Sequence, residues 1–221
     1  MEPRHVVLVG LMGTGKTTTG VLVAAALGMP FRDGDAMLEA ALGRTAAALR
    51  DEEGVEALHR AEARFLREAL AADRPSVIAA SAAVVDNPAC RAALRTPGVA
   101  VAWLRANPAV LGRRFSGDAA ASVAAGLEGT HRPAYGEDPG AFLAAQARRR
   151  ARRFAACRPR VIVDTGLLDP AAAAERIIAA LGGASGGAGR GQRLQASGPG
   201  GARSSARGYG RASRTGYQPH D

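Results

Sequence analysis

Residues 5–20 read HVVLVGLMGTGKTTTG and combine an apolar run, a glycine-rich turn and the start of a helical pattern. The run at 5–10 is short, rich in β-branched residues and apolar throughout, which is typical of a strand buried in a parallel sheet. After the turn, an Ala/Val/Leu-rich stretch that extends to about Gly28 predicts a helix. This order of elements indicates the first βα unit of a parallel sheet.

The rest of the chain repeats this alternation of short apolar runs and helical stretches. Further strands are predicted at 29–32, 76–80, 99–104 and 160–164. One long helical region is expected over 36–72, and a closing helix over 170–181. Strands separated by helices form βαβ units, whose crossovers cover both faces of a sheet. The predicted fold class is therefore α/β, with a parallel five-stranded sheet flanked by helices.

The composition divides the 221 residues into two parts. Overall, 47% of the residues are hydrophobic, which is typical of a globular chain. Residues 182–221 contain twelve glycines and six arginines against one acid, and they carry +5 of the net charge of +9. Because such a segment buries too little apolar surface to offset its ordering entropy, we predict one folded domain over 1–181 and a disordered Gly/Arg/Ser-rich tail over 182–221. A solvated tail is the favoured interpretation, and RNA binding through its Arg-Gly stretches is the alternative.

The sequence carries little that resembles a targeting or membrane segment. No apolar run reaches the ~18 residues that a membrane-spanning helix needs, and the first residues do not resemble a signal peptide. We therefore expect a cytoplasmic protein without membrane contacts. A monomer is expected as well.

The turn after the first strand carries the phosphate-binding motif Gly-x-x-x-x-Gly-Lys-Thr at positions 10–17. Its glycines let backbone N–H groups curl around an anion, and the following helix directs its positive end at the same point. In this motif Lys16, the only lysine of the chain, reaches the β- and γ-phosphates, and the Thr17 hydroxyl ligates Mg²⁺. The motif predicts ATP and Mg²⁺ as cofactors. The loop residues predicted to bind the nucleotide are Gly10, Gly13, Thr14, Gly15, Lys16, Thr17 and Thr18.

Two carboxylates follow the second predicted strand, in the sequence Asp33-Gly34-Asp35. Ligands of open α/β sheets collect at the carboxyl ends of the strands. Alternation along an extended backbone predicts that both carboxylates point to one side. We expect one of these carboxylates near the metal ion and the other near the hydroxyl that accepts a phosphoryl group. Two solvated acids at the end of a strand are the alternative.

Together these motifs resemble those of the shikimate kinase family. The similar stretches are GLMGTGKTTTG at 10–20 and DGD at 33–35, and the similarity extends over roughly 5–181. The resemblance implies a P-loop fold of the nucleoside-monophosphate-kinase type, with a lid over 116–130. It also implies that Lys16, Asp35 and Arg132 are catalytic, and that Thr17 and Asp33 belong to the magnesium shell.

The resemblance further implies contacts to adenine and to the carboxylate of the substrate. Arg114 is similar to a family residue that stacks on adenine, and Arg132 resembles the arginine of the lid. Arg150, four residues before Phe154, resembles the arginine that lies near the substrate carboxylate, with Arg149 as the neighbouring alternative.

Two departures from the family pattern fall in the substrate site. Family members carry Gly-Gly-Gly after the third strand, whereas this chain has Ala80-Ser81-Ala82. A family arginine is replaced by His59, which holds an anion less firmly than a bidentate guanidinium group does. Glu56 and Glu62 lie on the same predicted helix and are expected to be solvated. The residues predicted to bind the substrate are Asp35, His59, Ser81, Ala82 and Arg150.

The function expected from these residues is ATP-dependent phosphorylation of a hydroxyl on a small carboxylated metabolite, with shikimate as the first candidate. Another small-metabolite kinase, similar to gluconate kinase, is the alternative within this class of enzyme, because the Asp-Gly-Asp and Ser-Ala turns also resemble that group. A nucleotide-binding module without catalysis is the alternative from another class, motivated by the altered substrate turn and the arginine-rich tail.

Overall fold

The computed structural model describes residues 3–114 and 138–182, which belong to one compact unit. The lid expected over 116–130, Arg132, and the tail beyond Gly182 lie outside these residues. Within the described ranges, no helix combines the length and the apolar character that a membrane span requires.

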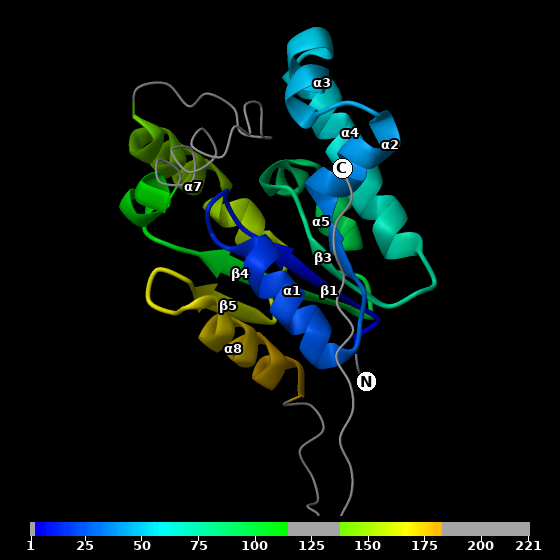
Figure 1. Ribbon diagram of the computed structural model, residues 1–221, viewed down its shortest axis with the longest axis vertical. Coiled ribbons are helices and arrows are strands. Elements are labelled where there is room, and N and C mark those ends of the chain that lie inside the picture. The colour runs from blue at the N-terminus through cyan, green and yellow to red at the C-terminus, as the bar shows by residue number, and fades with distance from the viewer. Residues whose placement is uncertain (1–2, 115–137, 183–221) are drawn as a thin grey trace, which may run out of the picture. The chain divides into compact units, whose positions relative to one another are not determined.

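The core of the fold is a five-stranded sheet in which every paired neighbour is parallel, in the order β2-β3-β1-β4-β5 (Figure 1). The central strand β1 pairs on both sides, with His5 opposite Ser76 on one side and Val99 on the other. The strands are β1 (His5–Val9), β2 (Phe31–Asp33), β3 (Ser76–Ala79), β4 (Val99–Arg105) and β5 (Val161–Asp164). The predicted fold class and all five strands are confirmed, with β2 beginning two residues later than expected.

Helices cover both faces of this sheet, as Figure 1 shows. Alternate residues of β1 supply both layers: Val6 and Leu8 pack in one cluster, and Val7 and Val9 in the other. The first cluster is completed by α1 and α8, and the second by α4, α5 and α7. The helices of these layers are α1 (Lys16–Leu27), α4 (Val55–Ala71), α5 (Pro88–Ala93), α7 (Pro139–Ala156) and α8 (Pro170–Gly182).

The helical region predicted over 36–72 is confirmed, but the chain divides it into three helices. These are α2 (Gly34–Leu42), α3 (Ala46–Glu53) and α4. Gly43 and Gly54 end the first two helices with φ values of 65° and 87°, where a side chain would be strained. The Thr45 side chain then caps α3 by accepting a hydrogen bond from Ala48 N at 3.0 Å. These breaks let α2 and α3 fold back against α4.

Two short helical segments complete the fold. A 3-10 helix, η1 (Ala82–Asp86), follows β3 directly, and residues 108–114 are helical after β4. Both segments begin just beyond the carboxyl end of a strand, which is the side of the sheet where the phosphate motif also lies.

Candidate active site

The phosphate motif forms a tight loop between β1 and α1. Gly10 has a φ of 152°, and a Cβ atom there would lie 2.2 Å from the carbonyl oxygen of Leu104. Gly13 and Gly15 take left-handed φ values of 77° and 79°, which glycine tolerates without strain. Gly15 is the N-cap of α1, and no side chain of the described residues caps this end of the helix. The N–H groups of the first turn of α1 therefore face the loop with the positive end of the helix dipole.

Lys16 begins α1 and reaches back into this loop. Its Nζ donates to the carbonyl oxygens of Gly10 and Leu11, each at 3.1 Å. Burial lowers the pKa of Lys16 from its ordinary value, and the carboxylates of Asp35, Asp33 and Glu62 oppose this effect in that order. Three carboxylates therefore lie near enough to the single lysine of the chain to favour its charged form.

The Thr17 hydroxyl donates to Asp33 Oδ2 at 2.8 Å. The other oxygen of the same carboxylate, Oδ1, accepts from Asp35 N at 3.1 Å and Ala36 N at 3.4 Å, and so caps α2. One carboxylate therefore fixes the start of α2 and also meets the hydroxyl that the motif assigns to a metal ion. A hydroxyl and a carboxylate are hard oxygen ligands of the kind that Mg²⁺ prefers, so these two residues fit the predicted ion.

The expectation that Asp33 and Asp35 alternate along one extended strand was wrong. Asp33 is the last residue of β2, and the chain turns into α2 at Gly34, which places Asp35 in the first helical turn. A Cβ atom at Gly34 would lie 3.0 Å from the carbonyl oxygen of Ala79, so the turn passes close to β3. The two carboxylates still line one cleft, because the tight turn replaces the alternation of a strand.

Two cavities meet beside Lys16. The nucleotide cleft, of about 760 Å³, lies along the phosphate loop, and the acceptor cavity, of about 500 Å³, lies between α3, α4, η1 and α7. The residues that line both are Met12, Lys16 and Asp35. All the loop residues predicted to bind nucleotide line the cleft except Gly10, whose role is to permit the turn. Thr14 is a further special case, because its fully buried hydroxyl donates to Leu11 O at 2.8 Å and so shapes the loop itself.

Arg114 lines the nucleotide cleft but not the acceptor cavity. It donates to Gly13 O at 3.2 Å and to Thr165 O at 2.6 Å, and it thereby joins the phosphate loop to the segment after β5. Leu168 and Pro170 of that segment also line the cleft. Leu168 and Pro170 were not predicted from the sequence, although they follow the carboxyl end of a predicted strand, where ligands collect.

The acceptor cavity brings together the five residues predicted to bind the substrate. Asp35, His59, Ser81, Ala82 and Arg150 all line it, although they come from five different elements or turns. Burial and then the charge of Arg150 lower the pKa of His59 below its ordinary value of 6.5. His59 is therefore neutral at neutral pH, and it can offer a hydrogen bond but not a positive charge where the family has an arginine.

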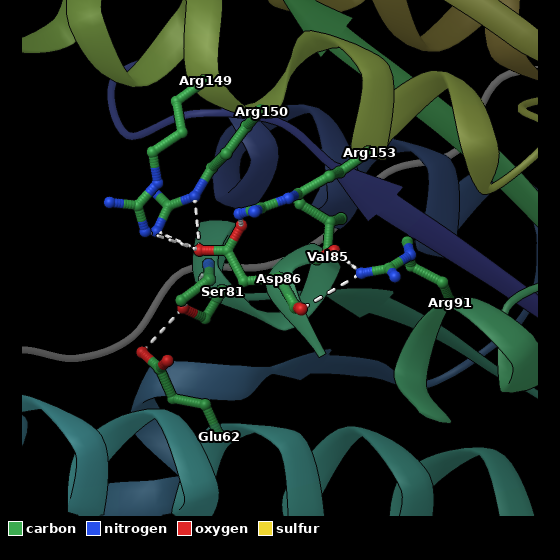
Figure 2. Close-up of polar contacts among 9 residues, drawn as sticks. Glu62, Ser81, Val85, Asp86, Arg91, Arg149, Arg150 and Arg153 are labelled. Carbon is green, nitrogen blue, oxygen red and sulfur yellow. Dashed lines mark hydrogen bonds and ion pairs between the residues drawn. The ribbon is translucent and has the colours of Figure 1, made fainter. Parts of the chain in front are cut away.

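The prediction that Glu62 is solvated was wrong. Its Oε1 accepts a hydrogen bond from the Ser81 hydroxyl at 2.6 Å (Figure 2), and its Oε2 is buried without a hydrogen-bond partner in the described part of the chain. Burial raises its pKa to about 7, with the hydrogen bond from Ser81 as the main opposing effect. Helical spacing gave a signal for this burial, because Glu62 shares one face of α4 with Leu66 and Ala69. Glu56, by contrast, is exposed as predicted.

Arg150 reaches the cavity from α7 and is bound to the carboxylate of Asp86, which was not predicted as a site residue from the sequence. Its Nε and Nη2 donate to Asp86 Oδ2 at 2.9 and 2.8 Å (Figure 2). Its side chain is 9% exposed, whereas that of Arg149 is 57% exposed. Of the two arginines that the sequence offered for the substrate carboxylate, Arg150 is thus the buried one and Arg149 the exposed one.

Comparisons with known proteins identify the family of this site. Residues 12–182 match the family described as shikimate kinase. A shikimate kinase of Caulobacter vibrioides is 34% identical over 182 residues, which cover 82% of this chain and 84% of that protein. One of Symbiobacterium thermophilum is 44% identical over 113 residues, which cover 51% of this chain and 64% of that relative.

The fold comparison agrees with the sequence comparison. The structure of shikimate kinase from Acinetobacter baumannii in complex with shikimate superposes with a TM-score of 0.70, over 81% of this chain and 92% of that chain, at 23% identity. At this identity the likeness shows the P-loop kinase fold, and the sequence matches supply the family. This chain belongs to the shikimate kinase family.

Proposed function

We propose that this protein transfers the γ-phosphoryl group of ATP to a hydroxyl of shikimate, giving shikimate 3-phosphate. The observation that carries the proposal is the meeting of two cavities at Lys16 and Asp35. One cavity presents a phosphate loop, and the other presents groups that would bind a carboxylate. A phosphoryl group held by Lys16 would therefore lie next to an acceptor hydroxyl held by Asp35. We also propose residues 1–181 as the kinase domain, acting in the cytoplasm as a monomer.

The nucleotide side of the proposal rests on the loop and on Arg114. The N–H groups at the start of α1 and the Lys16 ammonium would neutralise the β- and γ-phosphates, and Arg114 would lie against adenine. Thr17 and Asp33 would hold Mg²⁺. When bound, this ion supplies charge neutralisation to the phosphate oxygens. We propose Arg132, from the resemblance to the family, as the lid arginine that completes this neutralisation.

On the acceptor side, Asp35 would orient the hydroxyl and take up its proton as the phosphoryl group transfers. Cationic side chains in the cavity favour an acceptor that carries a negative charge. Lys16, Arg50, Arg149 and Arg150 line it, against the acids Asp35, Glu56 and Glu62, of which the last is half protonated near neutral pH. A hydroxylated metabolite with one carboxylate, such as shikimate, has the matching charge.

The family's carboxylate contacts are reduced in this chain, and this bears on the choice of acceptor. His59 is neutral, and Ser81 places a hydroxyl, already bonded to Glu62, where the family has a glycine. We therefore assign the main contact with the acceptor carboxylate to Arg150. We therefore expect this protein to bind shikimate more weakly than family members that carry all of these carboxylate contacts.

An assay of ADP release across acceptors tests this proposal. With Mg-ATP and the full chain, we expect turnover with shikimate well above that with gluconate or with no acceptor. Turnover confined to gluconate would favour the other small-metabolite kinase. ATP binding without turnover on either acceptor would favour a nucleotide-binding module that has lost catalysis.

A further inference from the structure

Asp86, the last residue of η1, collects three arginines of α7 on one carboxylate (Figure 2). Arg150 donates twice to Oδ2, Arg149 donates to the same oxygen at 3.3 Å, and Arg153 donates to Oδ1 at 2.5 Å. The Asp86 side chain is 18% exposed. The cluster therefore joins the turn after β3 to the helix that forms one wall of the acceptor cavity.

The contact with Arg150 has a specific geometry. Nε and Nη2 form one edge of the guanidinium plane, and both donate to the same carboxylate oxygen. Nη1, at the other edge, has no hydrogen bond to another described residue, although the side chain is nine-tenths buried and lines the acceptor cavity. A guanidinium fork binds a carboxylate in two parallel hydrogen bonds when its plane is fixed. Asp86 fixes that plane and leaves the N–H groups of Nη1 available to a ligand.

The positive charges of the neighbouring arginines explain why the orientation of the Arg150 guanidinium depends on the Asp86 carboxylate. Residues 149, 150 and 153 lie on adjoining positions of one helix, so their guanidinium groups would repel one another without Asp86. Burial opposes the ionisation of Asp86, but the hydrogen bonds from Arg150 and Arg153 outweigh it and lower its pKa to about 2. Asp86 is therefore charged throughout the neutral range. With three arginines around one acid, the cluster keeps a surplus of positive charge that can meet a second carboxylate.

We propose that Asp86 is a positioning residue, which holds the Arg150 guanidinium in the orientation that binds the carboxylate of the acceptor. This inference rests on the proposed function and names a residue on which its carboxylate contact depends. Asp86 itself does not touch the acceptor in this account, and its effect passes through Arg150.

The test compares steady-state kinetics of the full chain and its variants, with shikimate and ATP varied separately. In Asp86→Asn we expect the KM for shikimate to rise about tenfold, as for the loss of an oriented charged hydrogen bond, while the KM for ATP changes less than about twofold. Arg153→Gln is the matched control, because it removes the contact to Oδ1 on a side chain that does not line the cavity. In Arg153→Gln we expect a lower melting temperature, but a KM for shikimate within about twofold of that of the unsubstituted protein.

A double variant separates positioning from a purely structural role, and it serves even if Asp86→Asn alone does not fold. Once Arg150→Gln has removed the guanidinium, adding Asp86→Asn should leave the KM for shikimate unchanged. A further rise in the double variant would overturn the proposal, as would an unchanged KM in folded Asp86→Asn. If the unsubstituted chain turns shikimate over and either result appears, only the inference fails. If the unsubstituted chain does not turn shikimate over, the proposed function fails and the inference falls with it.

Discussion

Lys16 and Asp35 line both the nucleotide cleft and the acceptor cavity, and the charge of Asp35 is the largest of the effects that offset the lowering of the Lys16 pKa by burial. Lys16 is the first residue of α1, which follows β1, and Asp35 lies in the first turn of α2, which follows β2. In the proposed reaction, their side chains would mark the point at which the phosphoryl group passes from one cavity to the other.

Substitution of the two junction residues should affect different substrates. Lys16→Ala removes the charge that faces the β- and γ-phosphates, so we expect kcat to fall at least about 10²-fold and ATP binding to weaken. Asp35→Asn keeps the shape but removes the base, so we expect kcat to fall about 10²-fold with ATP binding retained. Calorimetry with ATP and steady-state kinetics measure both. Equal loss of ATP affinity in the two variants would contradict the division of roles.

The two oxygens of Asp33 can be tested separately from each other. Asp33→Asn keeps a side-chain oxygen that can cap α2, whereas Asp33→Ala loses it, so the alanine variant should be about 1 kcal/mol less stable than the asparagine variant. Both variants lose the charge beside the Thr17 hydroxyl, so both should need more Mg²⁺ for half-maximal rate. Urea unfolding gives the first quantity and a magnesium titration gives the second. A normal magnesium requirement in both would remove Asp33 from the metal site.

Glu62 should make stability depend on pH in a direction unusual for an acid. Its pKa is raised from 4.5 to about 7 in the folded protein, so between these values the folded state binds more protons than the unfolded state. Its contribution to stability is therefore full below pH 4.5 and is lost as pH rises through about 7. The loss amounts to up to about 3 kcal/mol.

Glu62→Gln keeps an oxygen that can accept the Ser81 hydroxyl but cannot ionise. We expect this variant to match the unsubstituted protein near pH 5 and to exceed it in unfolding free energy near pH 8, as measured by urea unfolding at each pH. A difference between the two proteins that stays constant over this range would contradict the burial of an ionising carboxyl.

The glycines of the chain should differ in what they tolerate. Gly10→Ala would place Cβ 2.2 Å from Leu104 O in backbone that cannot move far, so we expect a loss of more than about 2 kcal/mol in unfolding free energy together with a loss of ATP binding. Gly28→Ala is the matched control, because its φ of 62° is strained for alanine but no atom lies within 4 Å of the new Cβ. It should cost about 1 kcal/mol and leave turnover intact. Comparable costs at the two positions would show that the loop is not closely packed.

The sequence predicted the sheet and the phosphate loop because both depend on local patterns. Buried parallel strands are continuous apolar runs, and the loop needs glycines at fixed spacing around Lys16. The breaks between α2, α3 and α4 were signalled by Gly43 and Gly54 but were outweighed by the Ala/Leu-rich pattern. The pairs Ser81–Glu62 and Arg150–Asp86 join residues 19 and 64 positions apart, and only the folded packing brings them together.

Transfer of the terminal phosphoryl group is the most direct test of the whole account. The purified full chain is incubated with ATP labelled at the γ-phosphate, Mg²⁺ and shikimate, and the products are separated. We predict labelled shikimate 3-phosphate with the unsubstituted protein and at least about 10²-fold less with Lys16→Ala. Label that stays on ATP, or that appears only as inorganic phosphate, in a protein that binds ATP would contradict the account.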